Sequence, residues 1–397
     1  MKHKLVEENN HKQIFKHNVP EDETFTLIHS GDEYFIKMKE IIENAQEEIH
    51  LQTYIFEHDE TGNEIANCLK EAARRNVKVY ILLDAYGSAS LPDTFIQDLQ
   101  QSEIFFRFFS PMFSINNFYL GRRMHHKVLV ADAKTALIGG INIANKYRGS
   151  KDHEPWLDYA LKLNCPAAQD LQKLCRDYFF KDRSSKKIKP VLHSAGKTLV
   201  GIRQNDWLKN KTEVCDAYTN SINRANKEIV IVSSYFLPGK RLTNAIIKAC
   251  KRKVKVTLIL AGISDVPLIR SATSYLYSLF LRQNVSIYEW DSSVVHGKAA
   301  VVDNNWSTIG SFNLNDLSCY GSIEMNVEIH SQDFAKTLLR DFENVIEKCN
   351  QITLTTLKKR LSIFNKARHW VAYYMVRSTM RILTFLPHIR LFENYRS

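Results

Sequence analysis

Apolar and polar residues follow two different periodicities along this chain. Residues 48–56 and 77–83 read as strands, and residues 62–76 between them repeat apolar side chains at helical spacing. The same order of strand, helix and strand recurs at residues 228–236, 241–251 and 254–260. Strands joined through a helix predict parallel pairing, with helices covering the sheet. The pattern therefore predicts two similar α/β domains.

Two further apolar strands close each half of the chain: residues 127–131 and 135–138 in the first half, and 298–302 and 307–309 in the second. Each pair is opened by a His-x-Lys-x4-Asp octad, which consists of His125, Lys127 and Asp132 in the first half and His296, Lys298 and Asp303 in the second. Gly139, Gly140 and Asn142 follow the first octad, and Gly310, Ser311 and Asn313 follow the second. Each of these positions lies 171 residues from its partner, which indicates an internal duplication.

The duplication divides the chain into four parts. We expect a polar N-terminal extension over residues 1–24, a first domain over 25–197, a second domain over 198–350 and a basic tail over 351–397. The linker is predicted in the Ser- and Lys-bearing stretch 181–197. Residues 105–109 alternate aromatic side chains that we assign to the core, whereas residues 112–119 are interrupted by Asn and are expected to form an exposed apolar rim.

The composition is that of a globular protein: 44% of the 397 residues are hydrophobic and 24% are charged. The start of the chain does not resemble a signal peptide, and no stretch has the ~18 uncharged residues of a spanning helix, so we expect an unprocessed, non-spanning protein. The seven cysteines lack the spacing of a disulfide framework or a zinc site, which favours a reducing, cytosolic compartment.

Most of the positive charge lies in the tail. Residues 358–397 hold nine Lys or Arg and one acid, so the rest of the chain carries only +3 of the net +11. A nucleic-acid enzyme would spread basic charge over its active-site face, so no nucleic-acid partner is expected. Apolar and aromatic residues recur every three or four positions between residues 361 and 386, beside a basic side, which predicts an amphipathic helix bound to an anionic membrane. The alternative is a helix packed on the body of the protein.

The octads carry the chemistry. Residues i and i+2 of a strand point to the same side, so each half presents an imidazole beside an ammonium group. One imidazole can attack phosphorus while the other protonates the leaving alkoxide, because histidine titrates near neutrality. Lys127 and Lys298 supply positive charge to the phosphoryl oxygens, and Asn142 and Asn313 can add neutral donors. This chemistry requires no metal or cofactor, and we expect none.

These motifs resemble the phospholipase D superfamily, in which His-x-Lys-x4-Asp is followed by Gly-Gly or Gly-Ser and then Asn. Three segments extend the resemblance to bacterial cardiolipin synthases, specifically to the shorter type without membrane helices: Asn142 to Asp158, Ser234 to Pro238, and Gly310 to Glu328. The resemblance covers roughly residues 25–350. It implies two pseudo-twofold-related α/β domains, each with a mixed, largely parallel sheet, whose octads meet at one site.

The resemblance also implies roles for individual residues. His125 would be the nucleophile that forms a phosphohistidine, and His296 the general acid and then base. Asp158 would orient His125, Glu324 would orient His296, and Ser311 would support the site. Asp132 and Asp303 belong to the signature but are expected to hold turns. In the family an Asp usually follows Asn-Leu of the closing motif, whereas Asn315 stands here and Asp316 comes next.

The function we expect is phosphatidyl transfer between phospholipids, with phosphatidylglycerol as acceptor and cardiolipin as product, at the cytoplasmic face of the cell membrane. A hydrolytic phospholipase D shares all of these motifs, and a nuclease of the same superfamily is a third reading. A membrane scaffold with relict motifs is a fourth. The motifs alone leave the donor headgroup, the order of the two histidines and the oligomeric state open.

Overall fold

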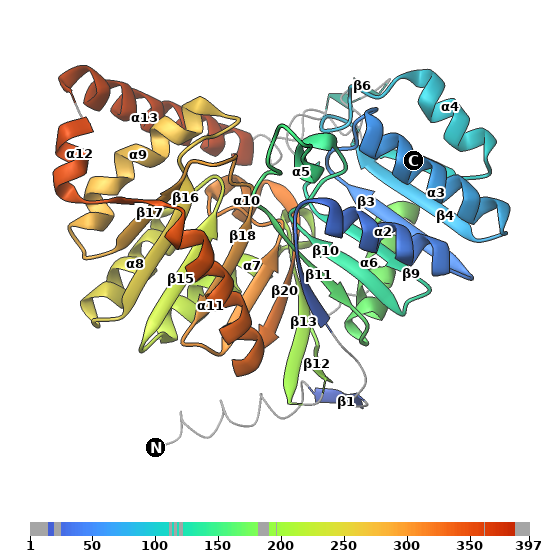
Figure 1. The fold of residues 1–397 in the computed structure, drawn as a ribbon, viewed down its shortest axis with the longest axis horizontal. Coiled ribbons are helices and arrows are strands. Elements are labelled where there is room, and N and C mark those ends of the chain that lie inside the picture. The colour runs from blue at the N-terminus through green and yellow to red at the C-terminus, as the bar shows by residue number, and fades with distance from the viewer. Residues whose placement is uncertain are drawn as a thin grey trace, which may run out of the picture.

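The computed structural model describes residues 15–19, 25–110, 113–114, 117–118, 122–181, 190–195, 197–360 and 362–385. Two lobes lie side by side, each built on one large sheet with helices packed against it (Figure 1). The first lobe is drawn in blue to green and the second in yellow to red, so the halves of the sequence correspond to the halves of the molecule. The prediction of two α/β domains is confirmed.

The sheet of the first domain has seven strands in the order β2-β11-β10-β9-β3-β4-β5. Their bounds are β2 Phe25–His29, β3 Glu48–Thr53, β4 Lys78–Asp84, β5 Phe105–Phe109, β9 Lys127–Ala131, β10 Thr135–Gly139 and β11 Tyr159–Leu163. Helices α2 (Asp32–Asn44), α3 (Glu60–Arg74) and α4 (Asp93–Gln101) bury apolar residues against one face, and α6 (Ala167–Phe180) covers the other. Short elements complete this half: β6 Phe113–Ser114, β7 Asn117–Phe118, β8 Arg123–Met124 and α5 Asn145–Arg148.

The second sheet follows the path β1-β12-β13-β20-β19-β18-β15-β16-β17-β21. Its strands are β1 Phe15–Val19, β12 Leu192–Ala195, β13 Thr198–Asp206, β15 Glu228–Ser233, β16 Lys255–Ala261, β17 Ser286–Trp290, β18 Lys298–Val302, β19 Trp306–Gly310, β20 Ser322–His330 and β21 Asn350–Ile352, with β14 Lys211–Thr212 beside β13. The helices are η1 Trp207–Lys209, α7 Glu213–Arg224, α8 Lys240–Lys251, α9 Pro267–Leu281, α10 Asp316–Tyr320, α11 Gln332–Glu347, α12 Leu354–Arg360 and α13 Ile363–Phe385.

Both sheets are mixed, but the expectation of largely parallel pairing is wrong. Parallel pairing joins β3-β4-β5 and β15-β16-β17, the strands that a helix connects. The strand that follows each octad instead pairs antiparallel with the octad strand, β10 with β9 and β19 with β18. Only three residues separate these strands, which permits a hairpin but no crossover. The turns place Asp132 and Asp303 in the left-handed region, at φ 54° and 53°.

A shared core holds the domains together. One apolar cluster contains Leu161 and Ile138 of the first sheet together with Val301, Ile309 and Met325 of the second. A separate cluster lies under α2, α3 and α4, and another under α7, α8, α9 and α13. The inner faces of the two sheets therefore pack against each other and against α6 and α11, which belong to the same cluster, while the other two clusters lie on the outer faces.

Several sequence expectations fall at the margins of this fold. β1 comes from the predicted N-terminal extension and β12 from the predicted linker, and the two pair in parallel. Residues 105–109 form the edge strand β5, where Phe105 is 52% exposed, so the core assignment is wrong for that residue. Of the apolar rim over residues 112–119, only the backbone of β6 and β7 belongs to the described residues.

Candidate active site

The two octads meet where the domains face each other. His125 precedes β9 and His296 precedes β18, so the histidines stand at equivalent strand starts. Their charged groups interact across the boundary between the domains. The charge on Lys298 lowers the pKa of Lys127, and the charge on Lys127 lowers the pKa of His296. Both lysines are fully buried, and each ammonium group donates to the backbone carbonyl of the histidine two residues before it. One site thus contains two imidazoles and two ammonium groups.

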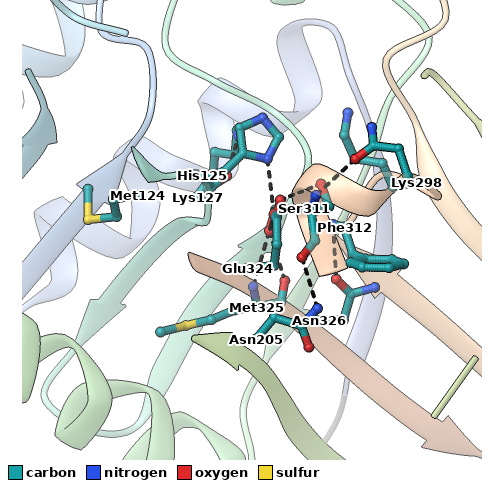
Figure 2. A network of polar contacts seen from close by, with 12 residues as sticks. Met124, His125, Lys127, Asn205, Lys298, Ser311, Phe312, Glu324, Met325 and Asn326 are labelled. Carbon is teal, nitrogen blue, oxygen red and sulfur yellow. Dashed lines mark hydrogen bonds and ion pairs between the residues drawn. The ribbon is translucent and has the colours of Figure 1, made fainter. Parts of the chain in front are cut away.

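Each histidine is bonded to a carboxylate of the other domain. His125 Nδ1 lies 3.0 Å from Glu324 Oε2, and His296 Nδ1 lies 2.5 Å from Asp158 Oδ2. Figure 2 shows Glu324 between the His125 ring and Ser311. The expected pairing, Asp158 with His125 and Glu324 with His296, is therefore wrong, because the carboxylates are exchanged between the domains.

The backbone explains this exchange. β8, just before His125, pairs with the start of β20, and the His125 amide donates to the Ile323 carbonyl at 2.9 Å. On the other side, the His296 amide donates to the Leu157 carbonyl at 2.8 Å. Each histidine is consequently hydrogen-bonded to the segment of the opposite domain that carries its carboxylate. Glu324 lies within β20, and Asp158 lies between the bridge residue Leu157 and the start of β11.

The two carboxylates have different surroundings. Glu324 accepts hydrogen bonds from Ser311 Oγ at 2.5 Å and from Ser318 Oγ at 2.6 Å, and all three side chains are buried. Asp158 instead accepts from the backbone amide of Tyr159 at 2.8 Å. Gly140 occupies the position equivalent to Ser311, and a Cβ there would collide with the Asp158 carboxylate. Glycine is therefore required at position 140 to make room for Asp158, whereas serine at position 311 supplies a hydrogen bond to Glu324.

Burial dominates the electrostatics of the site. It lowers the pKa of Lys127 to about 7 and that of Lys298 to about 8, and Lys127 is lowered further by the charge on Lys298. It also lowers the pKa of both His125 and His296, and it raises the pKa of Asp158 to about 7. Since desolvation disfavours every isolated charge, an anionic phosphate entering the site would favour protonation of the lysines.

The octad acids are not at this site. Asp132 lies at the far end of β9 and accepts the backbone amides of Gln46, Glu47 and Glu48 at 2.8–2.9 Å. Asp303 accepts the amides of residues 226, 227 and 228 at 2.8–3.1 Å. Their inclusion among catalytic residues is therefore wrong, whereas the expectation that they hold turns agrees with these contacts. Each acid fixes the start of the central strand of its sheet.

Asn142 differs from expectation, whereas the donor role expected for Asn313 stays a prediction. Asn142 is buried, accepts from the Ile55 amide at 3.0 Å and donates to the Tyr147 hydroxyl at 2.7 Å. The Tyr147 ring stands edge-on to His296, with centroids 5.2 Å apart, so Asn142 supports the wall beside His296. Asn313 is 4% exposed, and its carboxamide oxygen has no hydrogen-bond partner among the described residues.

Aromatic rings form a wall that the sequence analysis did not identify. The Tyr54 ring lies 5.0 Å from the His125 ring and 5.3 Å from Lys127 Nζ. Trp156 and Tyr235 approach His296 at 5.9 and 6.5 Å between ring centroids. The predicted strands 48–56 and 228–236 include Tyr54 and Tyr235, but β3 ends at Thr53 and β15 at Ser233, so both tyrosines lie just beyond a strand end. Their place near the end of a predicted strand was the available signal.

The structure explains why Asn315 can stand where the family usually has Asp. Asn315 is the N-cap of α10, and its side chain accepts a hydrogen bond from the Ser318 amide at 2.9 Å. Asn and Asp are equally good N-caps, so the substitution retains the helix that positions Ser318. Asp316 instead points away from Glu324, toward Arg377 at 3.8 Å.

Comparison with known proteins agrees with this geometry. The family model described as "Cardiolipin synthase, PLD-like domain" matches residues 38–157 and 218–346. The chain belongs to this family. Its membership confirms the expected class, a phosphatidyltransferase of the phospholipase D superfamily.

Individual relatives cover nearly the whole chain. Cardiolipin synthase B of Escherichia coli strain K12 is 31% identical over 371 residues, which are 91% of this chain and 89% of that protein. The minor cardiolipin synthase ClsB of Bacillus subtilis is 29% identical and covers 84% of both chains. Among solved structures, phosphatidylserine synthase of Haemophilus influenzae has the same fold, with a TM-score of 0.73 at 15% identity over 91% of this chain and 94% of that one. No helix in the described part of the chain combines the length and hydropathy that a membrane crossing needs.

Proposed function

We propose that this protein is a cardiolipin synthase that transfers a phosphatidyl group between phospholipids through a phosphohistidine. The observation that carries the proposal is the pair of crossed His–carboxylate contacts, His125 with Glu324 and His296 with Asp158, beside two buried lysines. This arrangement holds one phosphate between two imidazoles. The names of the relatives supply the lipid class.

We assign the nucleophile to His125. Glu324 accepts hydrogen bonds from two hydroxyl donors, Ser311 and Ser318, which fix its carboxyl group beside His125 Nδ1. A carboxylate that accepts from Nδ1–H leaves the lone pair on Nε2, the atom that attacks phosphorus. Burial raises the pKa of Asp158 to about 7. The His296–Asp158 pair therefore contains a group that titrates near neutral pH, as a pair that both donates and accepts a proton requires.

The reaction proceeds in two balanced steps. In the first step His125 Nε2 forms a bond to phosphorus, the bond to the headgroup oxygen breaks, and His296 donates a proton to the departing alkoxide. In the second step an acceptor hydroxyl gives its proton to His296, its oxygen attacks phosphorus and the P–N bond breaks. Lys127 and Lys298 stabilise the negative charge on the phosphoryl oxygens in both steps.

Restricted access favours transfer over hydrolysis. The side chains of His125 and His296 are only 14% and 5% exposed, and Tyr54 and Tyr235 stand beside them. A phosphohistidine in such a site is shielded from bulk water, so an alcohol delivered by a second lipid competes better.

We also propose that the protein works at the cytoplasmic face of the membrane as a peripheral protein. Phosphatidylglycerol is anionic, and α13 presents exposed aromatic residues, Trp370 and Tyr374, near the exposed cation Arg381. The scattered spacing of the seven cysteines suits a reducing compartment.

The test is to incubate the purified protein with phosphatidylglycerol vesicles and identify the lipid products by mass spectrometry. Cardiolipin and glycerol are expected; phosphatidic acid alone would indicate hydrolysis, and DNA cleavage without lipid turnover would refute the lipid assignment. After acid quenching, ³²P from labelled lipid is expected on the peptide that contains His125 and absent from the His125→Ala variant. Label on the His296 peptide instead would reverse the two roles.

A further inference from the structure

Three carboxylates near the octads have partners that explain them. Asp158 and Glu324 contact the two histidines. Asp84, whose charge acts on Lys127, is fully buried and accepts the backbone amides of residues 86, 87 and 124 at 2.8–3.1 Å. A further acid, Asp265, lies between β16 and α9 and has no role in the two steps of the proposed reaction.

Asp265 lies on the His296 side of the site. The Tyr235 hydroxyl donates to its carboxylate, and the phenolic oxygen is 2.9 Å from Oδ1 and 2.7 Å from Oδ2. The Tyr235 ring is edge-on to the His296 ring, with centroids 6.5 Å apart. Burial lowers the pKa of both His296 and Lys298, and the charge on Asp265 opposes that shift in both groups. The carboxylate is therefore one hydrogen bond away from the ring that flanks His296.

Asp265 can accept further hydrogen bonds. The residue is exposed, and among the described residues only Tyr235 donates to it, whereas an ionised carboxylate has about four lone-pair positions. Asp265 is the fourth residue after β16, and the fourth residue after β4 is Ser88, which is buried and hydrogen-bonded to the backbone of Tyr54 and Phe56 at 3.0 Å. Of these two turns, only the one beside His296 therefore offers a free acceptor.

The proposed reaction brings two alcohols in turn to His296. The headgroup of the donor lipid leaves as an alkoxide that His296 protonates, and the acceptor hydroxyl later gives its proton to the same imidazole. When both lipids are phosphatidylglycerol, both alcohols are glycerol units with a free hydroxyl on the carbon next to the reacting CH₂–O group. Each therefore presents a 1,2-diol beside His296, and a carboxylate is a strong acceptor for the second hydroxyl.

We propose that Asp265, held by Tyr235, binds the hydroxyl next to the reacting oxygen and makes the protein selective for alcohols that are 1,2-diols. This inference rests on the proposed function, because only transfer to an alcohol needs a site that selects one. The reacting oxygen is hydrogen-bonded to His296 while the neighbouring hydroxyl donates to Asp265, so two hydrogen bonds of about 2.8 Å hold the diol at two points. A monohydric alcohol forms only the first of them.

The test offers two alcohols to the same phosphohistidine. A phosphatidyl ester of p-nitrophenol serves as donor, because its leaving group has no neighbouring hydroxyl, and 1-propanol and 1,2-propanediol compete as acceptors at equal concentrations. Mass spectrometry gives the ratio of the two phosphatidyl alcohols. The wild-type protein should favour the diol by about tenfold or more, as expected for one hydrogen bond to a charged group. The isomer 1,3-propanediol, whose second hydroxyl is one carbon further away, should not be favoured.

Asp265→Ala should bring the product ratio close to one, and the phosphatidylpropanol that it still forms shows that the variant is folded. Asp265→Asn, which keeps the shape of the side chain but loses its charge, should lower the ratio in part and decides the question if the alanine variant does not fold. Asp333→Ala is the matched control, because it removes an exposed aspartate from α11 of the same domain and should keep the wild-type ratio. A carboxylate that only tunes the pKa of His296 would change both rates alike and leave the ratio as it is.

The outcomes separate this inference from the proposed function. Equal use of the two alcohols by the wild-type protein, or an undiminished preference for the diol in both Asp265 variants, would overturn the role of Asp265 and leave phosphatidyl transfer standing. Phosphatidic acid without either phosphatidyl alcohol would contradict transfer itself and overturn both.

Discussion

At the scale of single residues, the site is asymmetric although its two halves arose by duplication. Glu324 has two hydroxyl donors, whereas Asp158 has a backbone amide and a pKa raised by burial to about 7. Replacing the acid of each His–carboxylate pair should therefore impair a different part of the reaction.

Glu324→Gln and Asp158→Asn should each reduce cardiolipin formation by about 10²- to 10⁴-fold, since an amide favours the wrong imidazole tautomer. A phosphatidyl ester of p-nitrophenol needs no proton on its leaving group, so it should rescue release of the first product in Asp158→Asn but not in Glu324→Gln. Stopped-flow absorbance measures that release.

Asp170→Asn is the matched control, because Asp170 forms a hydrogen bond with His193 at 2.7 Å outside the site. Rescue of both variants, or of neither, would contradict the assigned roles.

The buried lysines predict a pH dependence of binding. Their pKa values in the empty site are about 7 and 8, below the reference of ~10.4 for a free lysine. A bound phosphodiester favours the ammonium form, so above pH 8 binding must take up protons and affinity should fall, by at most about tenfold per pH unit for each lysine. Inhibition by glycerophosphoglycerol, whose charge is constant from pH 6 to 10, measures this, and Lys127→Met should flatten the profile. An affinity independent of pH would show that the lysines stay charged in the empty site.

At the scale of elements, the sequence predicted α13 but not which of its sides is buried. The residues read as its apolar face include Phe364, Trp370 and Tyr374, which are 85%, 52% and 47% exposed. A second stripe, Ala372, Val376 and Met380, packs on the body. Packing of the helix on the body is therefore confirmed for this stripe, whereas membrane binding through the exposed side stays a prediction. Periodicity reports an apolar face without reporting what covers it.

Trp370→Ser with Tyr374→Ser should weaken binding to phosphatidylglycerol vesicles by at least about tenfold, since burying even one aromatic side chain contributes about 1.5–3 kcal/mol. Flotation measures it, and the melting temperature should change little because both residues are exposed. Phe180→Ser, equally exposed at 52% but on α6 of the first domain, serves as the control. Undiminished flotation would refute membrane docking through α13.

The strands and helices of the repeat were predictable, whereas the exchanged carboxylates were not. A duplication places Asp158 and Glu324 at comparable distances after their octads whether each acid serves its own histidine or the other one, so the sequence pattern is the same in both cases. Which carboxylate contacts which histidine is determined by the backbone pairing of β8 with β20 and of Leu157 with Val295. The paired segments lie far apart in the chain. Likewise, nothing local to Asn315 identified it as a helix cap before α10 was known.

At the scale of the whole molecule, the two domains share one apolar core and should unfold together. Ile309→Ala, in the second sheet, leaves a cavity against the first domain and should cost about 2–4 kcal/mol. Calorimetry should show a single transition at lower temperature, and hydrogen exchange should rise in β10 and β11 as well as in β19. Ile246→Ala, in the outer core of the second domain, is the comparison. Two separate transitions would show that the domains are independent.

The exchange of carboxylates has a consequence for synthesis of the chain on the ribosome, where the N-terminal half emerges first. At that stage His125 and Lys127 have been synthesised, but Glu324, the carboxylate that contacts His125, is nearly two hundred residues away and untranslated. Under the proposed mechanism, a nascent or truncated chain without β20 is therefore expected to be inactive toward lipids.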